Sequence, residues 1–189
     1  LLTAIRDLGI TGAYLDIGAH CGNHTVFFAT HCRANEVCAV EPSPDTYNLL
    51  RRTLKVNDIH AVAMHGGVHP SWRWVRSVEG SWQPPAGDPT RTNTGTRHIE
   101  QGRPGDVPAW TLDELGLPFE RVGLIKIDTE GLGAEVLASG SRLIERDQPV
   151  IVVEAATKPE QRAVARVLGR WNYLNVGCFC RTPTWLWRP

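Results

Sequence analysis

The sequence predicts a doubly wound α/β fold, in which a mostly parallel sheet lies between two layers of helices in a single domain over residues 1–189. Three observations predict it. Short apolar runs alternate with segments of helical periodicity, and the connections are long enough for parallel crossovers. The first apolar run ends in a glycine turn, as in nucleotide-binding α/β proteins. A chain of 189 residues has room for one such core and not for two.

The first third of the chain is expected to alternate regularly between strands and helices. The apolar runs are strand-sized, and each helix begins at a polar residue that is followed by apolar residues at helical spacing. In chain order we expect a strand over 13–17, a helix over 23–30, a strand over 37–40, a helix from Asp45 through Leu54 and a strand over 59–64.

After the third strand the alternation breaks. Residues 71–78 alternate apolar and polar side chains like an exposed or edge hairpin strand, and residues 80–108 are rich in Gly, Pro, Thr and Asn. The fold is therefore expected to carry a hairpin and loop insertion at about 70–110. Regular elements then resume with a helix over 111–115, a strand over 122–128, a helix over 134–146, a strand over 149–154, a helix over 160–171 and one or two strands within 175–187.

Composition narrows the partners and the compartment. Lys and Arg total 20 and Asp and Glu total 20, so no bulk field attracts nucleic acid or an anionic membrane. No apolar run approaches the roughly 20 residues that cross a bilayer. The five cysteines contain no C-x-x-C pair and no zinc spacing, which is typical of reduced thiols in the cytoplasm. We therefore expect a cytoplasmic protein without nucleic-acid or membrane partners. Its oligomeric state stays open, a homodimer included.

The first chemical motif is the turn after the first strand. Asp16 ends that strand, and Gly18 and Gly22 stand four residues apart, so the backbone can approach a ligand at a helix N-terminus. The dinucleotide fingerprint G-x-G-x-x-G is absent, because His20 occupies its second glycine position. The alternative interpretation is a structural glycine turn without a ligand.

A second acidic residue, Glu41, ends the second strand about 20 residues beyond the turn. A carboxylate at that place in an α/β nucleotide-binding unit accepts hydrogen bonds from ribose hydroxyls. An exposed glutamate that caps the helix beginning near Pro42 is the competing interpretation.

The third motif is charged. Strand periodicity puts Lys126, Asp128 and Glu130 on one side of the strand over 122–128 and its continuation. Burying an unpaired charge costs several kcal/mol, so three charged side chains on one side of a core strand need partners. They are expected to form either an ion pair or a polar ligand site at the carboxyl edge of the sheet. Glu154 ends the next strand and is expected at the same edge.

Together these motifs resemble those of FkbM-type methyltransferases, in the same order and over most of the chain. The matching segments are D-I-G-A at 16–19, E-P-S-P at 41–44, N-T-G at 93–95, T-L-D-E-L at 111–115, K-I-D-T-E-G at 126–131 and Glu154. The resemblance implies a Rossmann-like class I methyltransferase fold, S-adenosylmethionine as methyl donor, acceptors with hydroxyl groups on sugars, polyketides or other secondary metabolites, and no essential metal.

The sequence departs from the family pattern at three places. His20 stands where the family commonly has Asn. The segment after the third strand reads Gly66 to Pro70, and the Asp that the family often has at about this place is missing. Residues 132–134, Leu-Gly-Ala, replace a more usual aromatic and acidic continuation. Contacts near the donor are therefore expected to differ from those of the family.

The expected roles follow from the resemblance and from the chemistry of methyl transfer, which needs alignment and, for an alcohol, a base. Asp128 is the first candidate for the base, followed by Glu130, with Lys126 orienting them. Asn93 and Glu154 are expected to bind the acceptor, and the insertion at 70–110 to form its lid. The residues expected at the donor are Asp16, Gly18, His20, Gly22, Asn23, His24, Glu41, Pro42 and Ser43.

The leading function is O-methylation of a hydroxyl on a small molecule, secondary metabolite or sugar. N-methylation and a non-catalytic nucleotide-binding module are the alternatives. For two groups of side chains, two roles remain as alternatives. Three histidines near strand ends are either bases or ordinary hydrogen-bonding residues: His20, His24 and His65. Four tryptophans near the insertion either hold a flat acceptor or pack within the hairpin: Trp72, Trp74, Trp82 and Trp110.

Overall fold

The computed structural model describes residues 1–78, 97–116 and 118–189. In these ranges a central sheet contains the strands β1 (Thr11–Ile17), β2 (Arg33–Glu41), β3 (Val62–His65), β8 (Val122–Ile127), β9 (Val150–Glu154), β10 (Leu174–Phe179) and β11 (Thr184–Arg188). Their order is β10-β11-β9-β8-β1-β2-β3. The pairs from β3 through β9 are parallel, and β11 is antiparallel to both of its neighbours. The predicted mostly parallel, doubly wound sheet is confirmed.

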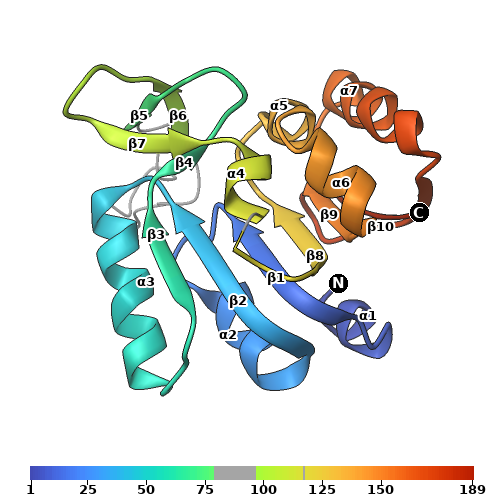
Figure 1. The fold of residues 1–189 in the computed structure, drawn as a ribbon, viewed down its shortest axis with the longest axis horizontal. Coiled ribbons are helices and arrows are strands. Elements are labelled where there is room, and N and C mark those ends of the chain that lie inside the picture. The colour runs from blue at the N-terminus through green and yellow to red at the C-terminus, as the bar shows by residue number, and fades with distance from the viewer. Residues whose placement is uncertain (79–96, 117) are drawn as a thin grey trace, which may run out of the picture.

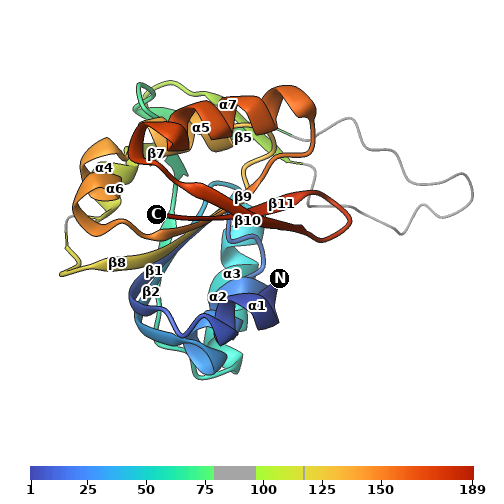
Figure 2. The ribbon, with the colours of Figure 1, turned by 90° about the vertical axis from the view of Figure 1, so that its right-hand side faces the viewer.

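Helices cover both faces of this sheet (Figure 2). One layer consists of α1 (Leu2–Asp7), α2 (Asn23–His31) and α3 (Pro44–Val56). The opposite layer consists of α4 (Leu112–Gly116), α5 (Gly133–Ala138), α6 (Ser141–Asp147) and α7 (Lys158–Leu168). Within the described ranges, no helix combines the length and the apolar character needed to cross a bilayer.

The sheet is apolar on both faces because successive residues of the central strands point to opposite helix layers. Tyr14 of β1 and Leu124 of β8 pack with Phe28 of α2, and all three side chains are fully buried. Their neighbours Leu15 and Ile125 belong to the larger core under α4 to α7. Each such burial stabilises the fold by about 1.5–3 kcal/mol, which explains why the central strands have no exposed face.

A second, smaller sheet lies beside the carboxyl end of β3 (Figure 1). Its strands are β4 (Gly67–Val68), β7 (Val107–Trp110), β5 (Trp74–Val78) and β6 (His98–Gln101), in that order. The hairpin strand predicted over 71–78 appears as β5. The prediction of a continuous loop over 80–108 is wrong for β6 and the start of β7. A strand as short as β6, with four residues, has little local signal, and it forms by pairing with β5, which is about 20 residues earlier in the chain.

The predicted helix over 134–146 is also divided. Ser139 and Gly140 separate α5 from α6, and the Ser139 hydroxyl accepts the Leu112 backbone N–H at 2.9 Å. A Cβ on Gly140 would lie 2.6 Å from a Leu112 side-chain carbon. The break therefore gives α4 a place to dock against the α5–α6 junction.

Candidate active site

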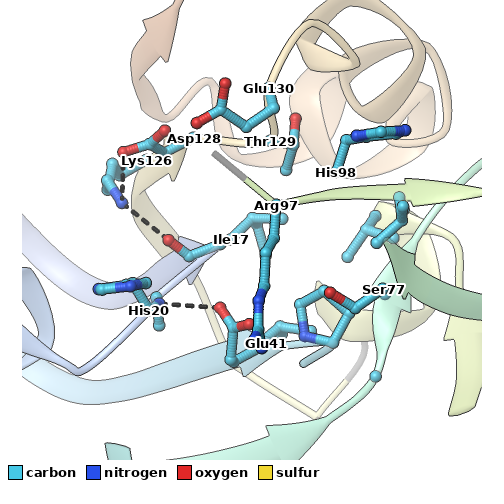
Figure 3. Close-up of a pocket in the computed structure, with 18 of the residues that line it drawn as sticks. Ile17, His20, Glu41, Ser77, Arg97, His98, Lys126, Asp128, Thr129 and Glu130 are labelled. Carbon is cyan, nitrogen blue, oxygen red and sulfur yellow. Dashed lines mark hydrogen bonds and ion pairs between the residues drawn. The ribbon is translucent and has the colours of Figure 1, made fainter. Parts of the chain in front are cut away.

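A cavity of about 240 Å³ opens at the carboxyl ends of β1, β2 and β8 (Figure 3). Its wall comes from the β1–α2 turn, the end of β2, the turn after β8, and strands β4, β5 and β6 of the small sheet. Parallel α/β sheets bind ligands at this edge because the strand ends and the helix N-termini diverge there. Both sheets therefore contribute to one binding space.

The turn after β1 is held by the ends of both neighbouring strands. The Gly18 and Ala19 N–H groups each donate to the Val40 carbonyl at 3.0 Å, and Asp128 N–H donates to the Ile17 carbonyl at 2.9 Å. Gly18 has φ +75°, and a Cβ there would lie 1.8 Å from the Asp128 carbonyl oxygen. Glycine is therefore required where the ends of β1 and β8 meet.

Glu41 is the most enclosed acidic side chain on the cavity wall near the turn. Its exposed fraction is 7%, and its two oxygens accept the backbone N–H groups of His20 and Ser43, each at 2.9 Å. Burial raises the pKa of Glu41, and these two backbone donors counteract that rise. Each carboxylate oxygen has lone pairs beyond the one used here, so Glu41 is able to accept hydroxyl hydrogens from a ligand in the cavity.

Lys126 connects the first and fourth parallel strands through its ammonium group. Its Nζ lies 3.0 Å from Asp16 Oδ1 and 3.5 Å from Asp128 Oδ2, and it donates to the Gly18 carbonyl at 3.2 Å. Burial by itself would lower the pKa of Lys126, but the carboxylates of Asp16 and Asp128 outweigh it and hold this pKa above its usual value. Lys126 is therefore a permanent cation between two acidic groups.

Three carboxyl groups gather beyond Lys126. One oxygen each of Asp128, Glu130 and Glu154 lies within 4.8 Å of the other two. Burial raises the pKa of Glu154 to about 8, and its hydrogen bond and charge interaction with Asp128 add to the rise. Burial also raises the pKa of Glu130, assisted by the nearby Asp128. Of these three, Asp128 and Glu130 line this end of the cavity.

The strand periodicity that predicted this cluster holds only in part. β8 ends at Ile127, and Glu130 lies in the following turn with φ +48°. The turn, and not the pleat of a strand, brings Glu130 next to Asp128. The predicted grouping of Lys126, Asp128 and Glu130 along the cavity wall is nevertheless what the structure shows.

Comparison with known proteins decides the family. Residues 16–174 match the model of the methyltransferase FkbM domain, which is most of the chain. The chain belongs to the FkbM methyltransferase family. Comparison with curated protein sequences finds no match.

Solved structures show the same fold at low sequence identity. The FkbM methyltransferase from Methylobacillus flagellatus KT has 16% identity and a TM-score of 0.64, covering 95% of this chain and 44% of that one. The precorrin-6y C5,15-methyltransferase from Geobacter metallireducens GS-15 has 14% identity and a TM-score of 0.57, with 98% and 83% covered. The O-methyltransferase from Bacillus cereus, solved with SAH, has 12% identity and a TM-score of 0.56, with 98% and 76% covered. The chain thus has a Rossmann-like class I methyltransferase fold and spans less than half of the Methylobacillus protein.

Most residues expected at the donor line the cavity of this FkbM-family chain. Those on its wall are Gly18, His20, Asn23, His24, Glu41 and Pro42. The remaining three lie behind the wall. Asp16 is fully buried and accepts the Thr25 hydroxyl at 2.6 Å, and Gly22 faces Leu50 of α3, whose nearest carbon would be 2.7 Å from an added Cβ. Ser43 supports Glu41 from its backbone N–H.

The residues expected at the acceptor are less concentrated. Glu154 interacts with the carboxyl group of Asp128 and is not part of the cavity wall that the structure describes. Asn93 lies outside the described residues, as do Trp82 and the rest of residues 79–96 of the predicted lid. Among the residues that are described, no tryptophan lines the cavity. Trp72 stacks on His69 with 3.7 Å between ring centroids, as hairpin packing predicts.

The histidines differ in position. His20 and His24 line the cavity, and burial lowers the pKa of His24. His65 stacks on Tyr47 with 4.7 Å between ring centroids and is not on the cavity wall. The cavity wall therefore carries both histidine and carboxylate side chains that are able to act as a base.

The small sheet adds wall residues that sequence reasoning missed. Ser77, Arg97 and His98 line the cavity, and Figure 3 shows Arg97 extending across it toward Glu41. Arg97 Nη1 donates to the Ser43 hydroxyl and lies 3.9 Å from Asp45 Oδ2. Residues 98–101 contain a single apolar side chain, Ile99, and stand next to a segment rich in Gly and Pro, so no clear strand signal is present in the sequence there.

Proposed function

We propose that this FkbM-family chain is an S-adenosylmethionine-dependent methyltransferase that methylates a hydroxyl group of a small molecule, secondary metabolite or sugar. One observation carries the proposal: Glu41 and Asp128, at the ends of different strands, open onto the same cavity. The first carboxylate suits a ribose diol, and the second suits a proton-bearing acceptor. Donor and acceptor groups would therefore meet in one space.

The residues present fit a nucleoside donor. Glu41 has both oxygens oriented by backbone N–H groups, so its free lone pairs can accept two ribose hydroxyls without reorganisation. The β1–α2 turn brings backbone close to the cavity at Gly18 and Ala19, next to the wall residues Asn23 and His24. S-adenosylmethionine, when bound, supplies a methyl group on a positively charged sulfur. The carboxylates of Asp128 and Glu130 would favour that positive charge over the neutral product.

Asp128 is the residue that removes the acceptor proton in this proposal. It lies on the cavity wall and forms an ion pair with Lys126, whose Nζ is 3.5 Å from Asp128 Oδ2. Asp128 would accept the hydroxyl proton of the acceptor, whose oxygen would receive the methyl group that bound S-adenosylmethionine would supply, with a neutral thioether as the leaving group. Glu130, beside Asp128, is placed to orient an acceptor that carries several hydroxyl groups.

An amine acceptor is the second candidate, because the acidic end of the cavity would attract a cationic group. The specific observation in its favour is that the carboxyl groups of Asp128 and Glu130 both line this end of the cavity. An amine loses its proton after attack, so N-methylation would depend less on Asp128 than O-methylation does.

The first test is calorimetry with S-adenosylmethionine, S-adenosylhomocysteine and NAD. We expect the first two to bind and NAD not to bind; binding of NAD alone removes the methyltransferase proposal. Transfer of a labelled methyl group to a defined panel of free sugars and amines then separates O- from N-methylation. Binding of the donor without transfer to any compound in cell extracts would favour a non-catalytic module.

The second test is Asp128→Asn. We expect turnover on a hydroxyl acceptor to fall by about 100-fold or more, the usual contribution of a general base, with S-adenosylhomocysteine affinity nearly unchanged. Asp58→Asn is the matched control, since Asp58 is exposed beyond the end of α3. Unchanged turnover in Asp128→Asn would refute the assignment of the base.

A further inference from the structure

We propose that Glu154 is a positioning residue for Asp128: the carboxyl group of Glu154 keeps its proton and uses it to donate a hydrogen bond to the Asp128 carboxylate. Asp128 is thereby held ionised and directed toward the cavity. This inference rests on the proposed function, because it explains how the base of that reaction is oriented. In this inference Glu154 contacts Asp128, whereas the sequence predicts a direct contact between Glu154 and the acceptor.

The sheet register creates the pair. β8 and β9 are parallel neighbours in which Ile127 is opposite Val153, so Asp128 and Glu154 are the next residues at the same sheet edge. Their carboxyl oxygens lie within 4.8 Å, and the two side chains share a hydrogen bond. Of the two, Asp128 is the one that lines the cavity. Glu154 therefore reaches the reacting atoms only through Asp128.

The charges around the pair determine which carboxyl group keeps the proton. Lys126 of β8 lies 3.5 Å from Asp128 Oδ2 and stabilises a negative charge there. Glu154 is partly buried and faces the carboxylates of Asp128 and Glu130, which disfavour its ionisation, while Lys126 is a weaker opposing influence. Two adjacent carboxyl groups cannot both ionise cheaply in such a site. The proton therefore belongs on Glu154 and the negative charge on Asp128.

Within residues 1–78, 97–116 and 118–189, the elements packed around the pair add no cation that reverses this distribution. On β11, Glu154 is paired with the uncharged Thr184. His98 of β6 and Glu160 of α7 act on Glu130, one lowering and one raising its pKa. Near neutral pH the pair thus holds one proton, with a midpoint for its loss at about pH 8.

Two anchors then fix the orientation of Asp128. Lys126 holds Oδ2, and the protonated Glu154 donates a hydrogen bond to the same carboxylate. Asp128 lines the cavity, so lone pairs that these contacts leave unused are available to accept a proton from an acceptor hydroxyl. Glu154 keeps its own proton throughout that step, so it needs no co-reactant. Above about pH 8 Glu154 ionises, its hydrogen bond to Asp128 is lost, and two like charges repel each other.

The test compares two substitutions that differ only in the donor they leave. Glu154→Gln keeps a hydrogen-bond donor at every pH, whereas Glu154→Leu removes the donor. Glu145→Gln on the exposed face of α6 is the matched control. In the protein labelled with 13C at the Asp and Glu carboxyl groups, we expect one Glu signal to titrate near pH 8 and the Asp128 signal to respond at the same pH. Both changes near pH 8 should be absent in Glu154→Gln and present in Glu145→Gln.

Turnover supplies the second readout, with labelled donor and the sugar panel. We expect wild-type kcat to fall above about pH 8, the Glu154→Gln value to stay within about threefold of wild type at pH 7 without that fall, and Glu154→Leu to lose about tenfold or more at every pH. A Glu154 signal that titrates near pH 4.5, or equal losses in the Gln and Leu variants, would overturn the inference. Failure of wild-type protein to bind S-adenosylhomocysteine would instead overturn the proposed function and leave the carboxyl titration interpretable.

Discussion

Replacing Gly18 with alanine tests the claim that the ends of β1 and β8 meet too closely for a side chain. Two costs arise from the structure. Gly18 has φ +75°, which costs an alanine about 1–2 kcal/mol in the left-handed region. The added Cβ would also lie 1.8 Å from the Asp128 carbonyl oxygen, so the two backbones must separate by more than an ångström.

Overpacking of this kind costs about 1–3 kcal/mol, so we expect Gly18→Ala to lower the free energy of unfolding by roughly 2–5 kcal/mol in total. The displaced backbone belongs to the proposed base and to the turn beside the donor. S-adenosylhomocysteine affinity should therefore fall by about tenfold or more, since each 1.4 kcal/mol of lost binding is a factor of ten. Urea denaturation and calorimetry measure the two effects separately.

Gly9→Ala is the matched control. Gly9 also has a positive φ, +61°, but no atom lies within 4 Å of an added Cβ. It should lose only the backbone cost of about 1–2 kcal/mol and bind S-adenosylhomocysteine normally. If Gly18→Ala matched Gly9→Ala in both stability and affinity, the close approach of β1 and β8 would not constrain the site, and the reasoning would be refuted.

Three further predictions concern the acidic groups. Glu41→Gln should weaken S-adenosylhomocysteine binding by about 10- to 100-fold in calorimetry, because an amide replaces a charged acceptor; unchanged affinity would contradict the ribose assignment. Lys126→Met should lower the free energy of unfolding in urea by about 3–5 kcal/mol, because it leaves Asp16 buried without its cation. Adding Asp16→Asn to this variant should recover part of the loss. If Lys126→Met were as stable as the wild type, the ion pair would be dispensable. The pKa of Glu154 is raised from 4.5 to about 8, so the folded state binds this proton more tightly than the unfolded state does. The free energy of unfolding should therefore decrease as the pH rises from 4.5 to about 8, and Glu154→Gln should reduce this dependence on pH. If the dependence were unaltered in Glu154→Gln, its source would be another group.

The sheet was predictable because the strands that build it carry local signals. Buried parallel strands are apolar on both faces, so runs such as 122–127 stand out from the surrounding helices. The charged residues that end these strands, Glu41 and Asp128 among them, also follow from sequence alone, since parallel strands bring their carboxyl ends to one edge. Family resemblance then gave these residues expected roles.

What escaped prediction depends on contacts between distant segments. β6 is four residues long, and it exists because it pairs with β5, with Ser77 opposite Ile99. The contribution of Arg97 to the cavity follows from that pairing and from its reach toward Ser43. Likewise the division of the predicted helix over 134–146 depends on the docking of α4, which no periodicity within the helix reveals. Asp16 looked like a ligand group, but its partner Lys126 is 110 positions away in the chain.

The wall of the cavity comes from two sheets, and β5, β6 and β7 share a small hydrophobic core of their own, although Val68 of β4 belongs to the core of the large sheet. Val75, Ile99 and Ala109 form the core of the small sheet, whereas the turn and the acidic groups depend on the large one. Substitutions on the small sheet can therefore reshape one side of the binding space while the elements beneath the methyl-transfer chemistry keep their packing. Such an arrangement would let related enzymes diversify in what they accept while preserving how they react, and it makes β5 and β6 the natural starting point for redirecting selectivity by design.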